Sequence, residues 1–197
     1  DTVVCFANTG KEVEATLRFV RDCAEHWQVP IHWLEYVPTE PGFALVDFDQ
    51  ASRQGGPFEA LIRKRQYLPN PVARGCTTSL KIRPMHRYLR HLGWTDWDQM
   101  IGIRADEQRR VAKIRARGHS TESTHETMCM PVADGGVTVR DVGTFWQAQP
   151  FDLDLHHEKR IFQRRHECPA LHINHPHGRF AIQAEQGGPL PRRSRRI

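Results

Sequence analysis

Apolar runs alternate with one amphipathic stretch over the first 36 residues, and this alternation limits the possible folds more than any other feature of the chain. Val3–Ala7 is a short, continuous apolar run, as expected of a strand buried on both faces. Thr9-x-x-Glu12 is a capping box that predicts the start of a helix. Ile31–Tyr36 predicts the next strand, after Pro30 has ended the helix. The helix between them has one apolar stripe, formed by Val13, Leu17, Val20, Ala24 and Trp27.

Strand, helix and strand joined so closely predict a βαβ unit, whose crossover is nearly always right-handed. Residues 37–57 are rich in Pro and Gly, which predicts a loop segment that runs outside the core. The sequence then predicts a short basic helix over Phe58–Tyr67 and a second helix with Pro84 in its first turn and Gly93 just after its end.

Gln99–Ile103 predicts another buried strand, and Thr138-x-x-Asp141 is a second capping box that predicts a last helix. Residues 105–123 carry much charge and little apolar periodicity, so we expect a mobile loop there. Alternating strands and helices predict an α/β fold with a mostly parallel, doubly wound sheet and helices on both faces.

The charge of the chain divides it at about residue 155. Residues 156–197 carry nine Lys and Arg against three Glu, a net charge of +6, so the remainder of the chain accounts for only −1 of the total of +5. The same segment holds six of the 12 histidines and loses apolar spacing. We therefore expect a domain over residues 1–155 and a basic, poorly ordered tail over 156–197, which offers a non-specific contact for nucleic acid.

Cysteine use and hydropathy indicate the compartment. The five cysteines are widely spaced and include no CxxC, which argues against a disulfide framework. No apolar run approaches the roughly 20 residues that cross a bilayer, and the N-terminus lacks a basic-then-apolar signal pattern. We expect a cytoplasmic protein with no membrane partner.

Ligands of doubly wound sheets bind beyond the carboxyl ends of the strands, and three polar segments follow predicted strands or begin helices. Asn8-Thr9-Gly10 combines a glycine that permits close backbone approach with the free N–H groups of a helix start. The alternative interpretation is a capped turn without a ligand.

The second segment, Arg74 to Pro84, places three permanent cations, Arg74, Lys81 and Arg83, around hydroxyl side chains at a helix start, which suits phosphate or sulfate. The third segment, Gly102–Arg110, includes Arg104 directly after a predicted buried strand. Its acidic residues Asp106 and Glu107 can hold Arg109 or Arg110 in a fixed orientation. A solvated basic helix start and a mobile charged loop are the respective alternatives.

Four segments in this order resemble the phosphoadenosine-phosphosulfate (PAPS) reductase family, in particular its variants from phage and bacterial genomes. They are VCFANTGKEVEATLRFV, CTTSLKIRPMHRYL, IGIRADEQRR and MPVADGGVTVRDVGTFW, and the likeness covers about residues 3–155. The resemblance implies an adenine nucleotide alpha hydrolase-like fold, related to the ATP pyrophosphatases, that binds PAPS or an ATP-like nucleotide. It also implies residues beside the nucleotide or near its phosphates and sulfate: Asn8, Thr9, Gly10, Lys81, Arg104, Arg109 and Arg110.

Two features of the family are absent from the sequence. The Ser-Gly-Gly-x-x-Ser phosphate loop that normally precedes the first segment does not occur, and neither does the CxxC segment that follows in relatives of this type. We therefore expect an N-terminally truncated fragment with an altered or frameshifted C-terminal region. Cys76 matches a cysteine that helps bind an iron–sulfur cluster in some members, although a cluster generally needs four thiolates.

Glu167-Cys-Pro-Ala-Leu-His172 is similar to the Glu-Cys-Gly-Leu-His motif of sulfonucleotide reductases, with one extra residue and a proline in place of the glycine. In that family the cysteine attacks sulfur and a thiol electron donor such as thioredoxin resolves the product, which makes Cys168 a candidate catalytic residue. The histidines of the same region leave a zinc site as an alternative.

Three functions follow from these observations. The first is a sulfonucleotide reductase-type oxidoreductase of sulfur metabolism, and the second is ATP-dependent adenylation or sulfur transfer of the ATP pyrophosphatase type. The third is a non-catalytic protein that binds nucleotides, or nucleic acid through the basic tail. The first two place a phosphorylated or sulfated adenosine beside Gly10, Lys81 and Arg104, whereas the third draws its affinity from the basic tail.

Overall fold

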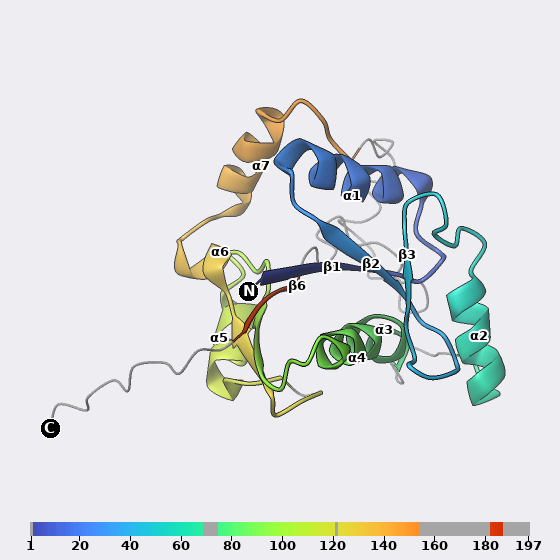
Figure 1. Ribbon diagram of the computed structural model, residues 1–197. Helices are drawn as coiled ribbons and strands as arrows, with labels where there is room; N and C mark the ends of the chain where they lie inside the picture. The colour runs from blue at the N-terminus through green and yellow to red at the C-terminus, as the bar shows by residue number, and fades with distance from the viewer. Residues whose placement is uncertain (1, 69–74, 121, 154–181, 187–197) are drawn as a thin grey trace, which may run out of the picture.

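The computed structural model describes residues 2–68, 75–120, 122–153 and the strand 182–186 (Figure 1). The first part of the chain forms β1 (Thr2–Asn8), α1 (Glu14–Trp27), β2 (Ile31–Glu35), β3 (Ala44–Val46) and α2 (Gly56–Arg65). A helical segment follows as α3 (Gly75–Thr77), the π-helix η1 (Thr78–Ile82) and α4 (Arg83–His91). The remaining elements are β4 (Trp97–Met100), α5 (Gln108–Arg117), β5 (Glu126–Cys129), α6 (Pro131–Asp134), α7 (Val139–Gln147) and β6 (Ile182–Gln186).

The described strands form one mixed sheet in the order β3-β2-β1-β6-β4-β5. β1 pairs with β2 in parallel and β4 pairs with β5 in parallel, whereas β3 and β6 run antiparallel to their neighbours. Because β6 is antiparallel to both β1 and β4, these two strands run in the same direction. The strands β1, β2, β4 and β5 therefore end at one common edge of the sheet, and the fold is α/β.

The predicted boundary at residue 155 does not coincide with the boundary of the sheet. β6 lies within the segment expected to be a tail, yet its backbone pairs with Thr2–Cys5 on one side and with Trp97–Gln99 on the other. The strand lies beside β1 in Figure 1. The neighbouring parts of the expected tail lie outside the described residues.

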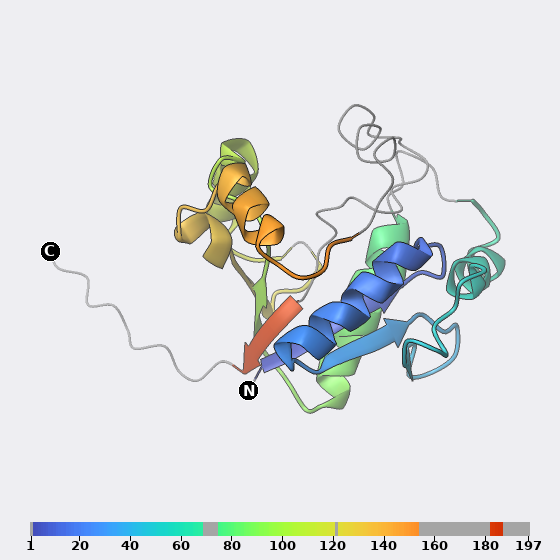
Figure 2. The ribbon, with the colours of Figure 1, turned by 90° about the horizontal axis from the view of Figure 1, so that it is seen from above.

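Helices α1 and α4 lie on opposite sides of β1 and β2 (Figures 1 and 2). Side chains of a strand alternate between the two faces of a sheet, and β1 follows this rule. Cys5 and Ala7 belong to a buried cluster with Met85 and Leu89 of α4, while Phe6 packs on the other face with Leu17 of α1. The continuous apolar run of β1 is explained by burial on both faces.

Several predicted elements are confirmed. β1, α1 and β2 occur where the first 36 residues predict them, Pro84 lies in the first turn of α4, and Gly93 follows that helix with a φ of 86°. Thr138 and Asp141 form both hydrogen bonds of a capping box at the start of α7.

Three predictions about local structure are wrong. Residues 105–123 were expected to form a mobile loop but contain the helix α5. Its two apolar residues, Val111 and Ile114, are too few to show a helical period in the sequence. They nevertheless pack on Ile101 and Ile103. Residues 37–57 contribute the edge strand β3, which pairs with β2. The hydrogen bonds expected of a capping box at Thr9 form in the loop before α1, and the helix begins only at Glu14.

Within the described ranges, no helix combines the length and the apolar character that crossing a membrane requires.

Candidate functional site

The carboxyl ends of β1 and β2 are joined by a buried polar network. Asn8 and Glu35 are the last residues of the two strands and are partners in the parallel ladder. Asn8 Nδ2 donates to Glu35 Oε1 at 2.6 Å and to the carbonyl oxygen of Ser52 at 2.9 Å. The backbone N–H and the hydroxyl of Ser52 donate to the Glu35 carboxylate at 2.6 and 2.7 Å. The side chain of Asn8 therefore joins the ends of β1 and β2 to the loop that contains Ser52.

The loop after β1 carries a second carboxylate, which binds a cation from another part of the chain. Glu12 Oε2 accepts hydrogen bonds from the backbone N–H of Thr9 at 2.9 Å and from its hydroxyl at 2.8 Å. Glu12 Oε1 lies 3.3 Å from Lys81 Nζ. The Glu12 side chain is only 2% exposed whereas that of Lys81 is 32% exposed, so the ammonium group meets solvent on one side. This ion pair joins η1 to the end of β1.

Position 10 can be occupied only by glycine. Its φ of +75° belongs to the left-handed region, which glycine adopts at no steric cost. A Cβ at this position would come within 3.0 Å of both the Gly55 Cα and the Pro57 Cδ. The loop after β1 therefore packs backbone to backbone on the start of α2, and only glycine permits this approach.

The π-helix η1 interrupts the helical segment 75–91 next to this loop. Single π turns widen the helix locally and frequently occur at functional sites. Ser79 is buried on η1, and its hydroxyl accepts a hydrogen bond from Arg65 Nη2 at 2.6 Å. Thr78 Oγ1 donates to Glu122 Oε1 at 3.2 Å. The π turn thus has contacts with α2, with the β1 loop and with the segment after α5.

Arg104 follows the carboxyl end of β4 and is held by two acidic side chains. Its Nε lies 2.9 Å from Asp106 Oδ1, and its Nη1 lies 3.6 Å from Glu107 Oε1. The hydrogen bond from Arg104 holds the pKa of Asp106 below its usual value. Burial acts to raise the pKa of Glu107, but the hydrogen bond from Arg110 and the other contacts lower it overall. Both acids are therefore carboxylates at neutral pH, and Arg104 has a defined orientation.

The register of the sheet shows how the residues at the end of β1 lie relative to Arg104, which follows β4. Val3 and Gln99 both pair with Ala184 of β6, so β1 and β4 are separated by one strand, about 10 Å between their axes. Asn8 is the last residue of β1, whereas Arg104 comes four residues after Met100, the last residue of β4, so the strand predicted over Gln99–Ile103 is observed earlier, over Trp97–Met100. The structure brings Thr9, Gly10 and Lys81 together and places Arg104 beyond the same edge. No hydrogen bond or ion pair among the described residues joins Arg104 to Lys81.

Of the other predicted site residues, Arg110 binds Glu107, the carboxylate that also contacts Arg104. Arg109 and Arg110 are exposed in the first turn of α5, where Arg110 pairs with Glu107. Cys76 packs partly buried against the cluster of Tyr36 and Leu61. In the described part of the chain, no group of three or more His, Cys, Asp or Glu is placed to hold a metal ion, so Cys76 belongs to none. Cys168 lies outside the described residues.

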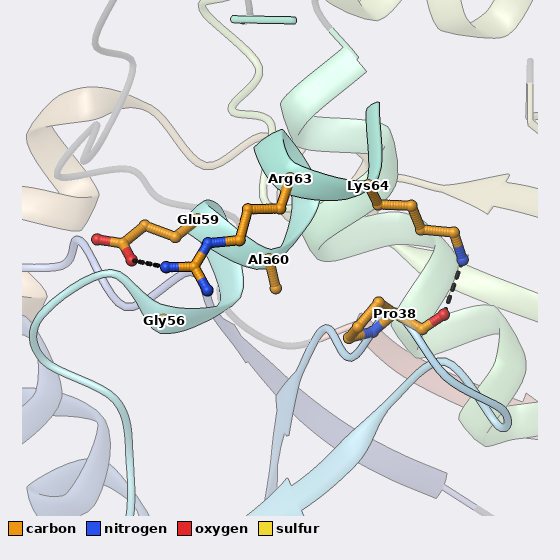
Figure 3. A pocket seen from close by; sticks show the side chains of 6 residues that line it. All are labelled: Pro38, Gly56, Glu59, Ala60, Arg63 and Lys64. Carbon is orange, nitrogen blue, oxygen red and sulfur yellow. Dashed lines mark hydrogen bonds and ion pairs between the residues drawn. The ribbon is translucent and has the colours of Figure 1, made fainter. Parts of the chain in front are cut away.

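A surface cavity of about 630 Å³ lies beside α2 and is lined by none of the predicted site residues (Figure 3). Its two cations already have partners, because Arg63 lies 3.7 Å from Glu59 and Lys64 Nζ donates to the carbonyl oxygen of Pro38 at 2.7 Å. We therefore place the candidate site at the sheet edge and not in this cavity.

Sequence reasoning missed three residues that shape the site. Glu35 and Ser52 complete the network of Asn8, and Glu12, assigned only to a helix cap, is the partner of Lys81. For Glu35 a signal was present, since it is a charged residue at the end of a mainly apolar strand. Ser52 lies in a Pro- and Gly-rich stretch where no local pattern marks it.

Comparison with known proteins gives one informative similarity. The chain is 28% identical over 173 residues to the uncharacterized nin region protein ORF290 of Escherichia phage lambda, and the match covers 79% of the chain. The chain spans about half of that protein, 52% of its length. No family model and no solved structure matches the chain. The similarity supports a relationship with phage proteins, and the description of the relative names no activity.

Proposed function

We propose that the carboxyl edge of the sheet binds an adenine nucleotide that carries phosphate or sulfate, with Lys81 and Arg104 as its cationic contacts. The contact between Lys81 and Glu12 carries this proposal, because it fixes a partly exposed ammonium group beside the end of β1. An ammonium group has three donors, and the bond to Glu12 uses one of them. The other donors are available to an anion on the open side.

Arg104 suits the same ligand for a different reason. Asp106 and Glu107 bind its Nε and one terminal nitrogen, so the guanidinium keeps its orientation before a ligand arrives. A planar guanidinium pairs with two oxygens of a phosphate or sulfate at once, whereas an ammonium acts as a point charge. A pre-oriented donor also loses less side-chain entropy on binding.

The resemblance to the PAPS reductase family extends this proposal to a sulfonucleotide as the ligand and to a doubly wound, adenine nucleotide alpha hydrolase-like sheet. Four strands that end at one edge and helices on opposite sides of β1 and β2 are compatible with that architecture. The backbone of Thr9 and Gly10 would lie against the nucleotide. Reductase chemistry through Cys168 and a thiol donor such as thioredoxin belongs to the same proposal.

Calorimetric titration of the chain with PAPS, adenosine 3′,5′-bisphosphate and ATP tests this function. We expect PAPS to bind more tightly than ATP, and Lys81→Gln and Arg104→Gln each to weaken binding about tenfold, which corresponds to about 1.4 kcal/mol. Arg90→Gln, an exposed arginine on α4, serves as the control of equal charge. Preference for ATP would instead favour adenylation or sulfur transfer, and no binding of any of the three would overturn the proposal.

A further inference from the structure

Helix α5 carries an unusual excess of positive charge on its exposed side. It contains five cations and no acidic residue, and its first turn has none of the acidic side chains that favour a helix start. Two of the five have partners, because Arg110 pairs with Glu107 and Arg115 lies 2.6 Å from Asp134. Arg109, Lys113 and Arg117 form no ion pair with any described residue, and all three are exposed.

These three cations lie on one face of the helix. They follow at intervals of four residues, about 6 Å of helix rise, and form a stripe that turns only slowly around the axis. The opposite face holds Val111 and Ile114, which pack on the cluster of Ile101 and Ile103. Ala112 and Ala116 flank the stripe and are exposed, so no bulky side chain obstructs the approach of a partner. We call Arg109, Lys113 and Arg117 the α5 basic stripe.

The stripe opposes the stability of the helix that carries it. Like charges four residues apart repel, at a cost of about 0.2–0.5 kcal/mol for each pair, and an arginine in the first turn opposes the helix dipole. A polyanion bound along the stripe would remove both unfavourable terms. α5 also lies with α6 and α7 at the end of the molecule away from α2 (Figures 1 and 2).

We propose that the α5 basic stripe binds the phosphate backbone of a nucleic acid. The exposed face offers regularly spaced cations and no aromatic or large aliphatic side chain. Protein interfaces depend largely on buried aromatic and aliphatic anchors, whereas non-specific binding to a phosphate backbone is mainly electrostatic. The stripe therefore fits a regularly charged chain better than an acidic protein. This surface belongs to the folded body and is distinct from the basic C-terminal residues.

Fluorescence anisotropy of the whole chain with a labelled 20-base-pair DNA duplex and the matching RNA strand, between about 50 and 200 mM salt, tests the proposal. Each phosphate contact contributes about −0.9 to the slope of log K against log salt. Replacing Arg109, Lys113 and Arg117 together by Gln should make the slope shallower by about 3 and weaken binding at least tenfold at the lower salt concentration. The three side chains are exposed, so the melting temperature should change little.

The control for net charge is the triple variant Arg18→Gln, Arg63→Gln and Arg90→Gln, which removes the same charge from exposed positions on α1, α2 and α4, two of them paired with Glu14 and Glu59. It should change the slope by less than 1. Replacing the three stripe cations should make the salt slope shallower by the same amount in a chain whose C-terminal cations have been removed. These are Arg192, Arg193, Arg195 and Arg196, all replaced by Gln.

Three results would overturn the proposal. The first is an equal change of slope in the two triple variants, which would mean that only net charge matters. The second is tighter binding of the unmodified chain to polyglutamate than to either nucleic acid, which would indicate an acidic protein partner. The third is no binding of DNA or RNA at about 50 mM salt.

Discussion

Asn8 and Glu35 end adjacent parallel strands and share a hydrogen bond of 2.6 Å inside the protein. The exposed fraction of Asn8 is 0% and that of Glu35 is 7%. A buried carboxylate is tolerated only when donors surround it, and Asn8 and Ser52 are the donors of Glu35 among the described residues.

Asn8→Ala should therefore destabilise the protein by at least about 2 kcal/mol, since it removes the hydrogen bond to the Glu35 carboxylate and also those to the Ser52 carbonyl oxygen and from the Gly10 N–H. Asn8→Asp should cost more, because it places a second carboxylate against the first. Urea unfolding monitored by circular dichroism measures both changes. If Asn8→Asp were as stable as the unmodified protein, Glu35 could not be a buried carboxylate paired through Asn8.

Lys81 and Glu12 should show measurable coupling in a double-mutant cycle. Lys81→Met leaves the buried Glu12 carboxylate without its cation, and Glu12→Gln removes the charge that Lys81 faces. Because Lys81 is partly exposed, we expect a coupling free energy of about 1 kcal/mol and not the larger value of a fully buried pair. Chemical denaturation of the two single variants and the double variant gives this quantity. Strict additivity would mean that the contact is absent in solution.

Glu126 should make the stability of the protein depend on pH in the acid range. Its carboxylate is buried and lies 3.1 Å from His86 Nε2 and 3.4 Å from Trp97 Nε1. Burial acts to raise the pKa of Glu126, but the hydrogen bond with His86 and further contacts bring it below the ordinary value of 4.5. A lowered pKa in the folded state contributes stability above the unfolded-state pKa, and this contribution is lost as the pH falls through the folded-state pKa.

Glu126→Gln should accordingly lose stability at pH 7 and show a smaller further loss below about pH 4.5 than the unmodified protein. Urea midpoints measured at pH 7 and at pH 4 test this expectation. An equally steep acid dependence in Glu126→Gln would assign the effect to other carboxylates.

The thiols of Cys5 and Cys23 should resist alkylation in the folded protein. Burial raises the pKa of each thiol to about 12. At pH 8 only about one thiol in ten thousand would be ionised, and the thiolate is the reactive form. Iodoacetamide labelling followed by peptide mass spectrometry should find both cysteines unmodified in buffer and modified in denaturant, with the half-buried Cys76 less protected. Rapid labelling of Cys5 in buffer would contradict its place in the core.

The sequence predicted those helices and strands whose signal lies within a few consecutive residues. The apolar period of α1, the β1 run and the Thr138 capping box each occupy a few consecutive residues, and the structure confirms them. Helix α5 has only Val111 and Ile114 as apolar anchors among its cations, so its period was obscured, and Ile101 and Ile103 supply the packing that holds it.

The sequence by itself determined the βαβ order and the residue types available at the strand ends, because apolar period, turn residues and capping motifs act between near neighbours. Only the tertiary structure decided which of those residues meet. Lys81 and Glu12 are 69 positions apart, and a strand from beyond residue 155 separates β1 from β4. Such pairings depend on how the helices and strands pack, and no local pattern of residues encodes that arrangement.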